Sequence, residues 1–246
     1  MNHLNTFSIA ARCPRTGMFG VAVSTAVPAV GGIVPFIKPG LGAIATQSWV
    51  NPYLGIDGLK LLEEGLPAQG ALDRLIAADP GRDVRQLGIV DRNGNVAAHT
   101  GSNCVDWAGH ITGSNFTVQG NMLVGAATIE AMAEAAEKSA AFPLYERLML
   151  VLEAGQAAGG DKRGKQSAAI KVYHEEEFAY VDIRVDEHRY PVAELRRVFE
   201  IVKHQLLPFA DGMPSRKDPL RGLPEEVTAM IMTPPPYRPG GTGGVA

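Results

Sequence analysis

Two pairs of short apolar runs, each joined by a tight turn, constrain the fold most strongly. In TFSIAAR (residues 6–12) alternate side chains are apolar, and the turn CPRTG separates this run from MFGVAVST (18–25). In QLGIVDRNGNVAAHTG (86–101), Asn93-Gly94 predicts the positive φ angles of a tight hairpin turn. Strands joined by such short turns pair antiparallel, because a parallel pair requires a long crossover. The hydroxyl side chains of the first hairpin are expected at its polar edge: Thr6, Ser8, Ser24 and Thr25.

Helical spacing of apolar residues follows the predicted strands. Between residues 53 and 79 it predicts two helices, with the break near Gly65 and Pro67. The other predicted elements are a strand over 40–50, helices over 129–140 and 143–158, strands over 166–174 and 178–185, and a helix over 192–207. Because hairpins dominate and the helices are segregated from them, the pattern predicts an α+β fold with mainly antiparallel sheets.

One domain is expected over residues 1–207. The 246 residues suffice for a single large core, and the composition does not shift before this point. Within the domain, the core spans 6–190 and is followed by the helix 192–207. Residues 208–246 are predicted to form a C-terminal extension rich in proline and glycine, which ends in PPPYRPGGTGGVA.

Charge and cysteine content exclude several classes of protein. A formal net charge of −3 gives no electrostatic basis for binding nucleic acid or a membrane surface. The two cysteines, Cys13 and Cys104, lack the spacing of a disulfide framework or a metal site. The sequence MNHLNTFSIAAR lacks a secretory pattern, and no run approaches the ~18 apolar residues of a membrane span. We therefore expect a cytoplasmic protein that uses no metal and no organic cofactor.

Thr6 is the first candidate for chemistry, as a hydroxyl at the start of the first strand. A threonine hydroxyl becomes nucleophilic when a base removes its proton, and a free α-amine on the same residue can do so. That amine titrates near ~7.7–8.0, whereas a lysine amine titrates near ~10.4. An internal amide nitrogen cannot accept the proton, so this interpretation requires cleavage between Asn5 and Thr6. The alternative is an ordinary strand residue.

The stretch ATQSWVNPYLG carries groups suited to a small polar ligand. Gln47, Trp49 and Asn51 alternate in the sequence and are expected on one strand face. Amides and an indole N–H would then lie beside an aromatic surface. The alternative is a strand end that caps its own loop.

The stretch TVQGNML places two side-chain amides, Gln119 and Asn121, beside Gly120. Such a group can donate to a developing oxyanion, a contribution worth ~3–4 kcal/mol in other enzymes. The alternative is a plain turn.

Charged residues concentrate in AGQAAGGDKRGKQSAAI (154–170), between a helix and the next strand. A plain helix end needs one glycine and one basic residue, so this density favours a binding loop. Asp161 is suited to orienting a neighbour, and Arg163 can grip a carboxylate with two hydrogen bonds. Lys162 and Gln166 belong to the same predicted binding set. The alternative is a solvated basic loop.

His99 ends a predicted hairpin strand and is a candidate general base. A lone histidine is more often structural, and no Ser or Asp spacing marks a triad here. Cys104 lies in the loop near Trp107, where a buried, unreactive thiol is the default interpretation.

Seven stretches, taken in order, resemble a bacterial family of unknown function in the N-terminal nucleophile (Ntn) hydrolase-like superfamily. They are TFSIAAR, GVAVST, ATQSWVNPYLG, RQLGIVDRNGNVAAHTG, WAGHITG, VQGNML and AGQAAGGDKRGKQSAA, and the resemblance covers Thr6 to about Arg197. The resemblance implies a four-layer α-β-β-α sandwich with two antiparallel sheets between helix layers. It also implies hydrolysis of an amide-type C–N bond by an N-terminal nucleophile, which would be Thr6. In many relatives the matching threonine is expected to follow the initiator methionine directly, whereas Asn2 to Asn5 intervene here.

The sequence therefore predicts an Ntn-type amidohydrolase acting on a small carboxylate-bearing amide, lactam or N-acyl compound. Thr6 would form an acyl-enzyme, and Asn121 near Gly120 would stabilise the oxyanion. Arg163, with Lys162 or Lys165, would hold the carboxylate. Ser24 completes the predicted substrate-binding set.

Two alternatives remain open from the sequence. One is a catalytically silent protein that keeps the sandwich and binds a small molecule, and the presence of Met1 to Asn5 supports it. The other is a hydrolase with an internal nucleophile, Ser8 or Cys104, and His99 as its base. Exposed apolar positions on the helix 192–207 predict a homodimer or a higher homo-oligomer.

Overall fold

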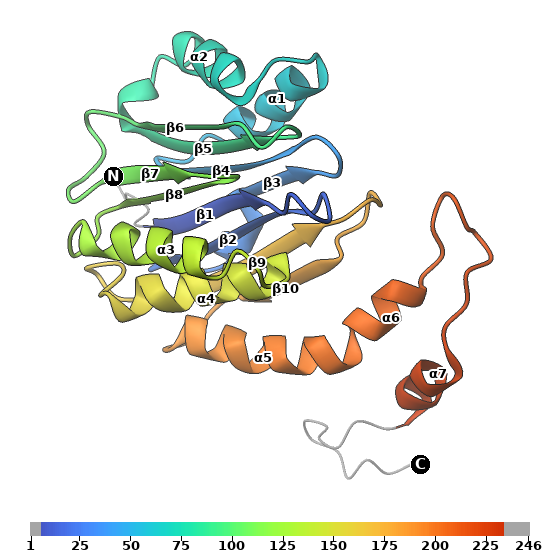
Figure 1. Ribbon diagram of the computed structural model, residues 1–246. Helices are drawn as coiled ribbons and strands as arrows, with labels where there is room; N and C mark the ends of the chain where they lie inside the picture. Colours follow the sequence, from blue (N-terminus) through green and yellow to red (C-terminus); the bar gives the residue numbers. More distant parts are fainter. Residues whose placement is uncertain (1–5, 234–246) are drawn as a thin grey trace. The chain divides into compact units, whose positions relative to one another are not determined.

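The computed structural model of the chain describes residues 6–233 (Figure 1). It divides into two compact units, the first ending at Arg197 and the second beginning at Val198. The division therefore falls inside the predicted helix 192–207. Across the described part of the chain, no helix has the length and apolar character needed to span a membrane. Residues 6–233 also contain no group of three or more His, Cys, Asp or Glu side chains placed to hold a metal ion.

Six antiparallel strands form the larger sheet of the first unit, in the order β10-β9-β2-β1-β8-β7. Their bounds are β1 Thr6–Arg12, β2 Phe19–Thr25, β7 Gly109–Gly113, β8 Phe116–Asn121, β9 Ser167–Tyr173 and β10 Val181–Val185. The first strand of the chain is thus an interior strand, with β2 on one side and β8 on the other.

Four antiparallel strands form the smaller sheet, in the order β3-β4-β5-β6. Their bounds are β3 Pro35–Lys38, β4 Gly42–Ser48, β5 Arg85–Asp91 and β6 Val96–Thr100. The two sheets face each other, with β1 and β8 packed against β4 and β5 (Figure 1).

Two pairs of helices pack on the sheets. Helices α1 (Pro52–Glu63) and α2 (Ala68–Ala78) contact the smaller sheet, and α3 (Ala127–Lys138) and α4 (Leu144–Ala157) contact the larger one. The predicted break near Gly65 and Pro67 is confirmed, since α1 ends before it and α2 begins after it.

Strand alternation decides what fills the space between the sheets. Small and branched residues, including Ala10 on β1 and Ala43 and Ala45 on β4, form an apolar cluster between the sheets. Toward the other end of the same strands, the residues at the same period of two are polar: Ser8 on β1 and Gln47 on β4. The space between the sheets is therefore apolar at one end of β1 and polar at the end where β1 begins.

The second unit is helical within the described residues. Helix α5 (Pro191–Gln205) enters it from the first unit, and α6 (Leu207–Gly212) and α7 (Glu225–Met232) follow. The sequence patterns predicted neither α6 nor α7 in the extension 208–246. The segment PPPYRPGGTGGVA lies outside the described residues.

One local prediction was wrong, one alternative is excluded, and three strands were not predicted. Thr6, Ser8, Ser24 and Thr25 are buried rather than at an edge, because β8 and β9 cover both sides of the first hairpin. Residues 119–121 belong to strand β8 and not to a turn. The strands β3, β7 and β8 were not predicted.

The turn between β5 and β6 also differs from the prediction. Gly94 has a φ of +82°, but Asn93 keeps an ordinary negative φ. Asp91 and Asn95 form the last pair, and Gly94 N–H donates to the oxygen of Asp91 at 3.0 Å. This is a three-residue loop that ends in a left-handed glycine, a common hairpin alternative to the two-residue turn.

Asp91 joins that turn to helix α2. Its carboxylate accepts from the N–H groups of Ala68, Asn93 and Asn95 at 2.9–3.0 Å, and its side chain is buried. We predict that Asp91→Ala lowers the free energy of unfolding by about 2–4 kcal/mol, because three N–H groups lose their acceptor. Urea unfolding measures this effect. Asp73→Ala, at an exposed position on α2, should change stability by less than about 0.5 kcal/mol, and equal losses in both variants would contradict the assignment.

Candidate functional site

Thr6 begins β1 between two other polar strand ends. It pairs across the sheet with Thr25 at the end of β2 and with Asn121 at the end of β8. The hydroxyl of Thr6 donates to the hydroxyl of Thr25 at 3.3 Å. All three side chains are at most 1% exposed. Antiparallel pairing therefore brings together three polar residues that lie far apart in the sequence.

Next to Thr6, a buried set of side-chain amides connects the two sheets. We call it the amide layer, and it consists of Gln47, Gln86, Gln119 and Asn121. Gln47 Nε2 donates to the main-chain oxygen of Thr6 at 3.2 Å, and Gln47 Oε1 accepts from the Ser8 hydroxyl at 2.6 Å. Ser8 in turn accepts from Gln119 Nε2 at 2.6 Å. Polar groups from both sheets thus satisfy one another away from water.

Gln86 is the centre of the amide layer. Its Oε1 accepts from Gln47 Nε2 at 2.8 Å and from Asn121 Nδ2 at 3.0 Å. Its Nε2 lies 2.8 Å from the main-chain oxygen of Gly120 and 3.0 Å from the hydroxyl of Thr100. Gln86 therefore fixes the orientation of Asn121, the predicted oxyanion donor, from the opposite sheet.

Gly88 leaves the room that the amide layer needs. A Cβ at this position of β5 would overlap Gln119 Oε1 and would lie 2.7 Å from a methyl carbon of Thr117. Gln119 Oε1 instead accepts from the Thr117 hydroxyl at 2.9 Å. A glycine on β5 is therefore required for the close approach of β8.

The predicted binding loop lies beside the Thr6 end of the larger sheet. Asp161 is buried, and its carboxylate accepts from the main-chain N–H of Ala26, just after β2, at 3.1 Å. A short bridge pairs Asp161 with Leu123, just after β8. Gln166 N–H donates to the oxygen of Thr25 at 2.8 Å. The loop therefore contacts the ends of both strands that flank Thr6.

The three cations of the loop have different partners. Lys162 Nζ donates to the main-chain oxygen of Asp106 at 2.6 Å. Arg163 pairs with Asp161 at 3.3 Å, and Lys165 Nζ lies 5.0 Å from the centre of the Tyr190 ring. Arg163 is thus the cation most directly tied to the residue that contacts the end of β2.

Ser24 faces β9 rather than an open surface. Its hydroxyl donates to the main-chain oxygen of Ser167 at 3.2 Å, and its side chain is fully buried. Ser24 and Gln166 therefore support the strands around Thr6, the first through its side chain and the second through its backbone.

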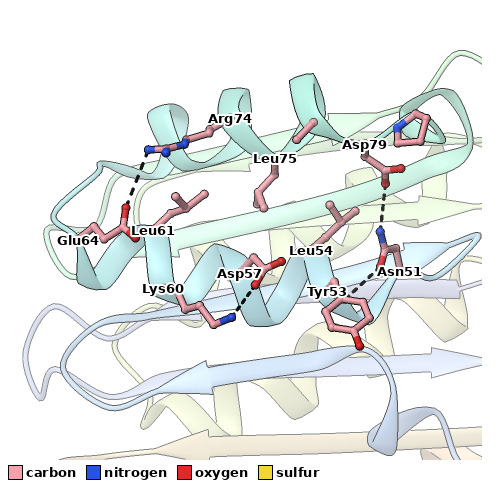
Figure 2. Close-up of a pocket in the computed structure, with 12 residues that line it drawn as sticks. Asn51, Tyr53, Leu54, Asp57, Lys60, Leu61, Glu64, Arg74, Leu75 and Asp79 are labelled. Atoms are coloured by element: carbon pink, nitrogen blue, oxygen red, sulfur yellow. Dashed lines mark hydrogen bonds and ion pairs between the residues drawn. The ribbon is translucent and has the colours of Figure 1, made fainter.

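Trp49 and Asn51 do not share a strand face with Gln47, because β4 ends at Ser48. Trp49 is 37% exposed, and Asn51 caps α1 by accepting from Tyr53 N–H at 3.1 Å. Asn51 also donates to Asp79 at one end of a groove of about 400 Å³ between α1 and α2 (Figure 2). The prediction extended the strand alternation past the residue at which the strand ends.

His99 and Cys104 do not form a pair. His99 Nε2 lies 2.9 Å from the oxygen of Arg82, and the Cys104 thiol donates to the oxygen of Arg85 at 3.3 Å. Burial raises the pKa of the Cys104 thiol, although hydrogen bonds from Ser48 and Gly101 oppose the shift. The predicted unreactive state of this cysteine agrees with its burial.

Sequence reasoning missed Gln86, Thr100 and His110. His110 Nδ1 lies 2.8 Å from the Thr100 hydroxyl, which links the edges of the two sheets. Burial lowers the pKa of His110, and the charge of His99 lowers it further. Gln86 is the second residue of β5 and is followed by apolar residues, so only its polarity at an inward position would have identified it.

These features define a class: an α+β protein with two facing antiparallel sheets, a buried amide layer, and a strand-initial threonine at the polar end. The chain belongs to a family of unknown function, DUF1028, whose model matches residues 6–195. A crystal structure of the protein SPO2555 from Silicibacter pomeroyi, from the same family, is 32% identical. It aligns over 90% of this chain and 96% of that chain with a TM-score of 0.82.

One further solved structure is much less similar. Anbu (ancestral beta-subunit) from Yersinia bercovieri aligns over 85% of this chain and 98% of that chain, with 13% identity and a TM-score of 0.37. This likeness is too low to carry an argument about fold or activity. The search of curated proteins found no match.

The amide layer yields a stability prediction. Gln86→Leu should lower the free energy of unfolding by about 2–4 kcal/mol, because Gln47, Asn121 and Gly120 each lose a buried partner. Chemical denaturation measures the loss. Gln69→Leu, at an exposed position on α2, is the control and should stay within about 0.5 kcal/mol of the unchanged protein. A Gln86→Leu protein of unchanged stability would show that the layer is not what holds the sheets.

Asp79 yields a prediction about pH. Burial raises its pKa, but hydrogen bonds from Arg85, Gly81 N–H and Asn51, with the Arg85 charge, outweigh burial and lower the pKa. The ionised carboxylate therefore stabilises the fold above its unfolded pKa of about 3.9, and this contribution is lost as the pH falls through the folded value. Asp79→Asn should lower the melting temperature at pH 7, and the difference should shrink as the pH falls below about 3.9. A pH-independent difference would contradict the ionised hydrogen-bonded role.

Proposed function

We propose that this protein is an Ntn-type hydrolase that cleaves the C–N bond of a small carboxylate-bearing amide, lactam or N-acyl compound. Thr6 is the proposed nucleophile, after the chain is cleaved between Asn5 and Thr6. The proposal includes the four-layer α-β-β-α sandwich of that superfamily, for which the facing sheets and their helix pairs are the support. Nucleophile and base both belong to Thr6, so the proposed reaction needs no metal or organic cofactor.

The position of Thr6 is the observation that carries the proposal. It is the first residue of an interior strand, and it lies between Thr25 and Asn121 at the polar end of the sheets. Its carbonyl is held by Gln47 from the facing sheet. A reacting residue is best placed on such a rigid element, where neighbouring hydrogen bonds fix its geometry.

The proposed reaction follows from these groups. The freed α-amine of Thr6 takes the hydroxyl proton as the oxygen adds to the substrate carbonyl. Asn121 Nδ2 uses one N–H for Gln86, and its second N–H is the proposed donor to the oxyanion. The C–N bond then breaks, the proton passes to the leaving nitrogen, and water hydrolyses the ester on Thr6.

The predicted binding loop, residues 161–165, is called the charged loop below. Its charges support a substrate that carries a carboxylate. Arg163 lies next to Asp161, which contacts the end of β2 beside Thr25. A guanidinium in this position can bind a carboxylate through two parallel hydrogen bonds. Lys162 belongs to the same proposed contact region, since it links the loop to Asp106.

A chain that begins at Thr6 tests the proposal. We predict that this chain, released from a cleavable fusion, hydrolyses members of a panel of N-acyl amino acids, anilides and lactams. Thr6→Ala in the same chain should lower the rate by about 10³-fold or more, whereas Thr6→Ser should keep measurable activity. Liquid chromatography with mass detection follows the products. Equal rates for the unchanged chain and its Thr6→Ala variant would rule out this nucleophile.

A second function, ligand binding without turnover, has one observation in its favour. In the full chain the Thr6 hydroxyl is buried, and five residues precede it. A ligand that raises the melting temperature of both the full chain and the chain beginning at Thr6, and that neither chain converts, would favour this alternative.

A further inference from the structure

A second cavity lies on the first unit, away from the contacts of Asp161. It has a volume of about 250 Å³ and is bordered by the end of α4, the charged loop and the start of α5. Gln156, Lys165 and Tyr190 give it polar groups, and Ala157, Val192 and Ala193 give it an apolar wall. A few polar groups in a mostly apolar cavity are typical of a small-molecule site.

Lys165 provides an unneutralised positive charge at this cavity. Among the described residues, its ammonium makes no ion pair, and its contact is the face of the Tyr190 ring at 5.0 Å. The Arg189 guanidinium lies 5.3 Å from the same ring. The side chain of Lys165 is partly buried, so its charge is less screened than that of a fully exposed lysine.

The acidic residue of the cavity is engaged elsewhere. Glu153 makes two hydrogen bonds of 2.8 Å to Arg196, which also pairs with Glu146 at 2.7 Å. This carboxylate is therefore held by a guanidinium on α5 and does not pair with Lys165. Lys165 is therefore the cation that an anion in the cavity would contact, whereas Arg196 is shared by Glu146 and Glu153.

Gln156 provides an acceptor without a donor. Its Oε1 atom is buried and receives no hydrogen bond from any described residue. Leaving a buried carbonyl oxygen unpaired costs about 1–3 kcal/mol, so such atoms are rare and mark strain, water or a missing ligand. The Oε1 atom is closed off from the cavity, so the polar contact that the cavity offers a ligand is Lys165, which no carboxylate of the described residues neutralises.

We propose that this cavity binds a small organic carboxylate with a short acyl group, such as an N-acyl amino acid. The carboxylate pairs with Lys165, and the acyl group packs on Val192 and Ala193. Size limits the ligand, because the cavity lies just below the range of about 300–1,000 Å³ that drug-sized ligands occupy.

This site is separate from the proposed catalytic one. The carboxylate of Asp161 contacts Ala26 N–H beside the Thr6 strand, whereas Lys165 contacts the ring of Tyr190. The inference therefore does not depend on Thr6 chemistry. A ligand in the cavity would still affect the position of the charged loop. Lys165 directly precedes Gln166, whose backbone N–H donates a hydrogen bond to the oxygen of Thr25.

Calorimetric titration of the full chain with N-acetylglycine tests the inference. A Thr6→Ala background excludes turnover, and N-acetylglycinamide is the neutral comparison ligand. We expect N-acetylglycine to bind with a Kd on the order of 1 mM and the neutral amide to bind much more weakly. Lys165→Met should weaken binding by at least about tenfold.

Lys60→Met is the control, since it removes a lysine that pairs with Asp57 on α1 instead. It should leave the Kd within about twofold, and circular dichroism should show that all variants are folded. Unchanged binding in Lys165→Met would overturn the proposal. Loss of binding in Lys162→Met but not in Lys165→Met would place the ligand near Thr6 and overturn it as well, as would the absence of binding at millimolar concentration.

Discussion

The amide layer between the sheets is the interaction on which the rest of the structure depends. Gln47, Gln86, Gln119 and Asn121 would each be costly to bury alone, but Gln47 and Asn121 donate to Gln86, and the side chain of Gln119 is joined to Gln47 through Ser8. Their hydrogen bonds require one register between the two sheets, because a shift by one residue would turn each amide away. An apolar core elsewhere between the sheets supplies stability, whereas the amide layer specifies the alignment of strands from both sheets.

That alignment sets the geometry around Thr6. The layer holds the carbonyl of Thr6 through Gln47 and the side chain of Asn121 through Gln86, both from the smaller sheet. The larger sheet adds Thr25 by strand pairing, and the charged loop is tied to that strand end through Asp161. Two sheets and one loop therefore converge on a single residue, which is a reason to look for chemistry there.

Sequence patterns predicted where helices and strands lie along the chain better than which strands lie next to one another. The period of two correctly placed Thr6 and Ser8 on one face and Phe7 and Ile9 on the other, and the helix break at Gly65 was correct. The expected polar edge was wrong because β8 and β9, which cover the first hairpin, come from distant parts of the chain. Gln86 was missed for the same reason, because its hydrogen-bond partners lie on other strands, β4, β6 and β8. The sequence showed that the 161–165 loop is charged. It did not show that Lys162, Arg163 and Lys165 have three separate partners.

The intact mass of the protein, produced without an N-terminal tag, tests the central claim most directly. If Thr6 is the nucleophile, the account predicts a species that lacks residues 1–5 and begins at Thr6, because only then does the hydroxyl have an adjacent amine. Incubation of purified full-length protein should convert it to this species if the cleavage is autocatalytic. A mass that stays full-length, or that lacks Met1 alone, in both the producing cells and the purified protein would contradict the hydrolase account.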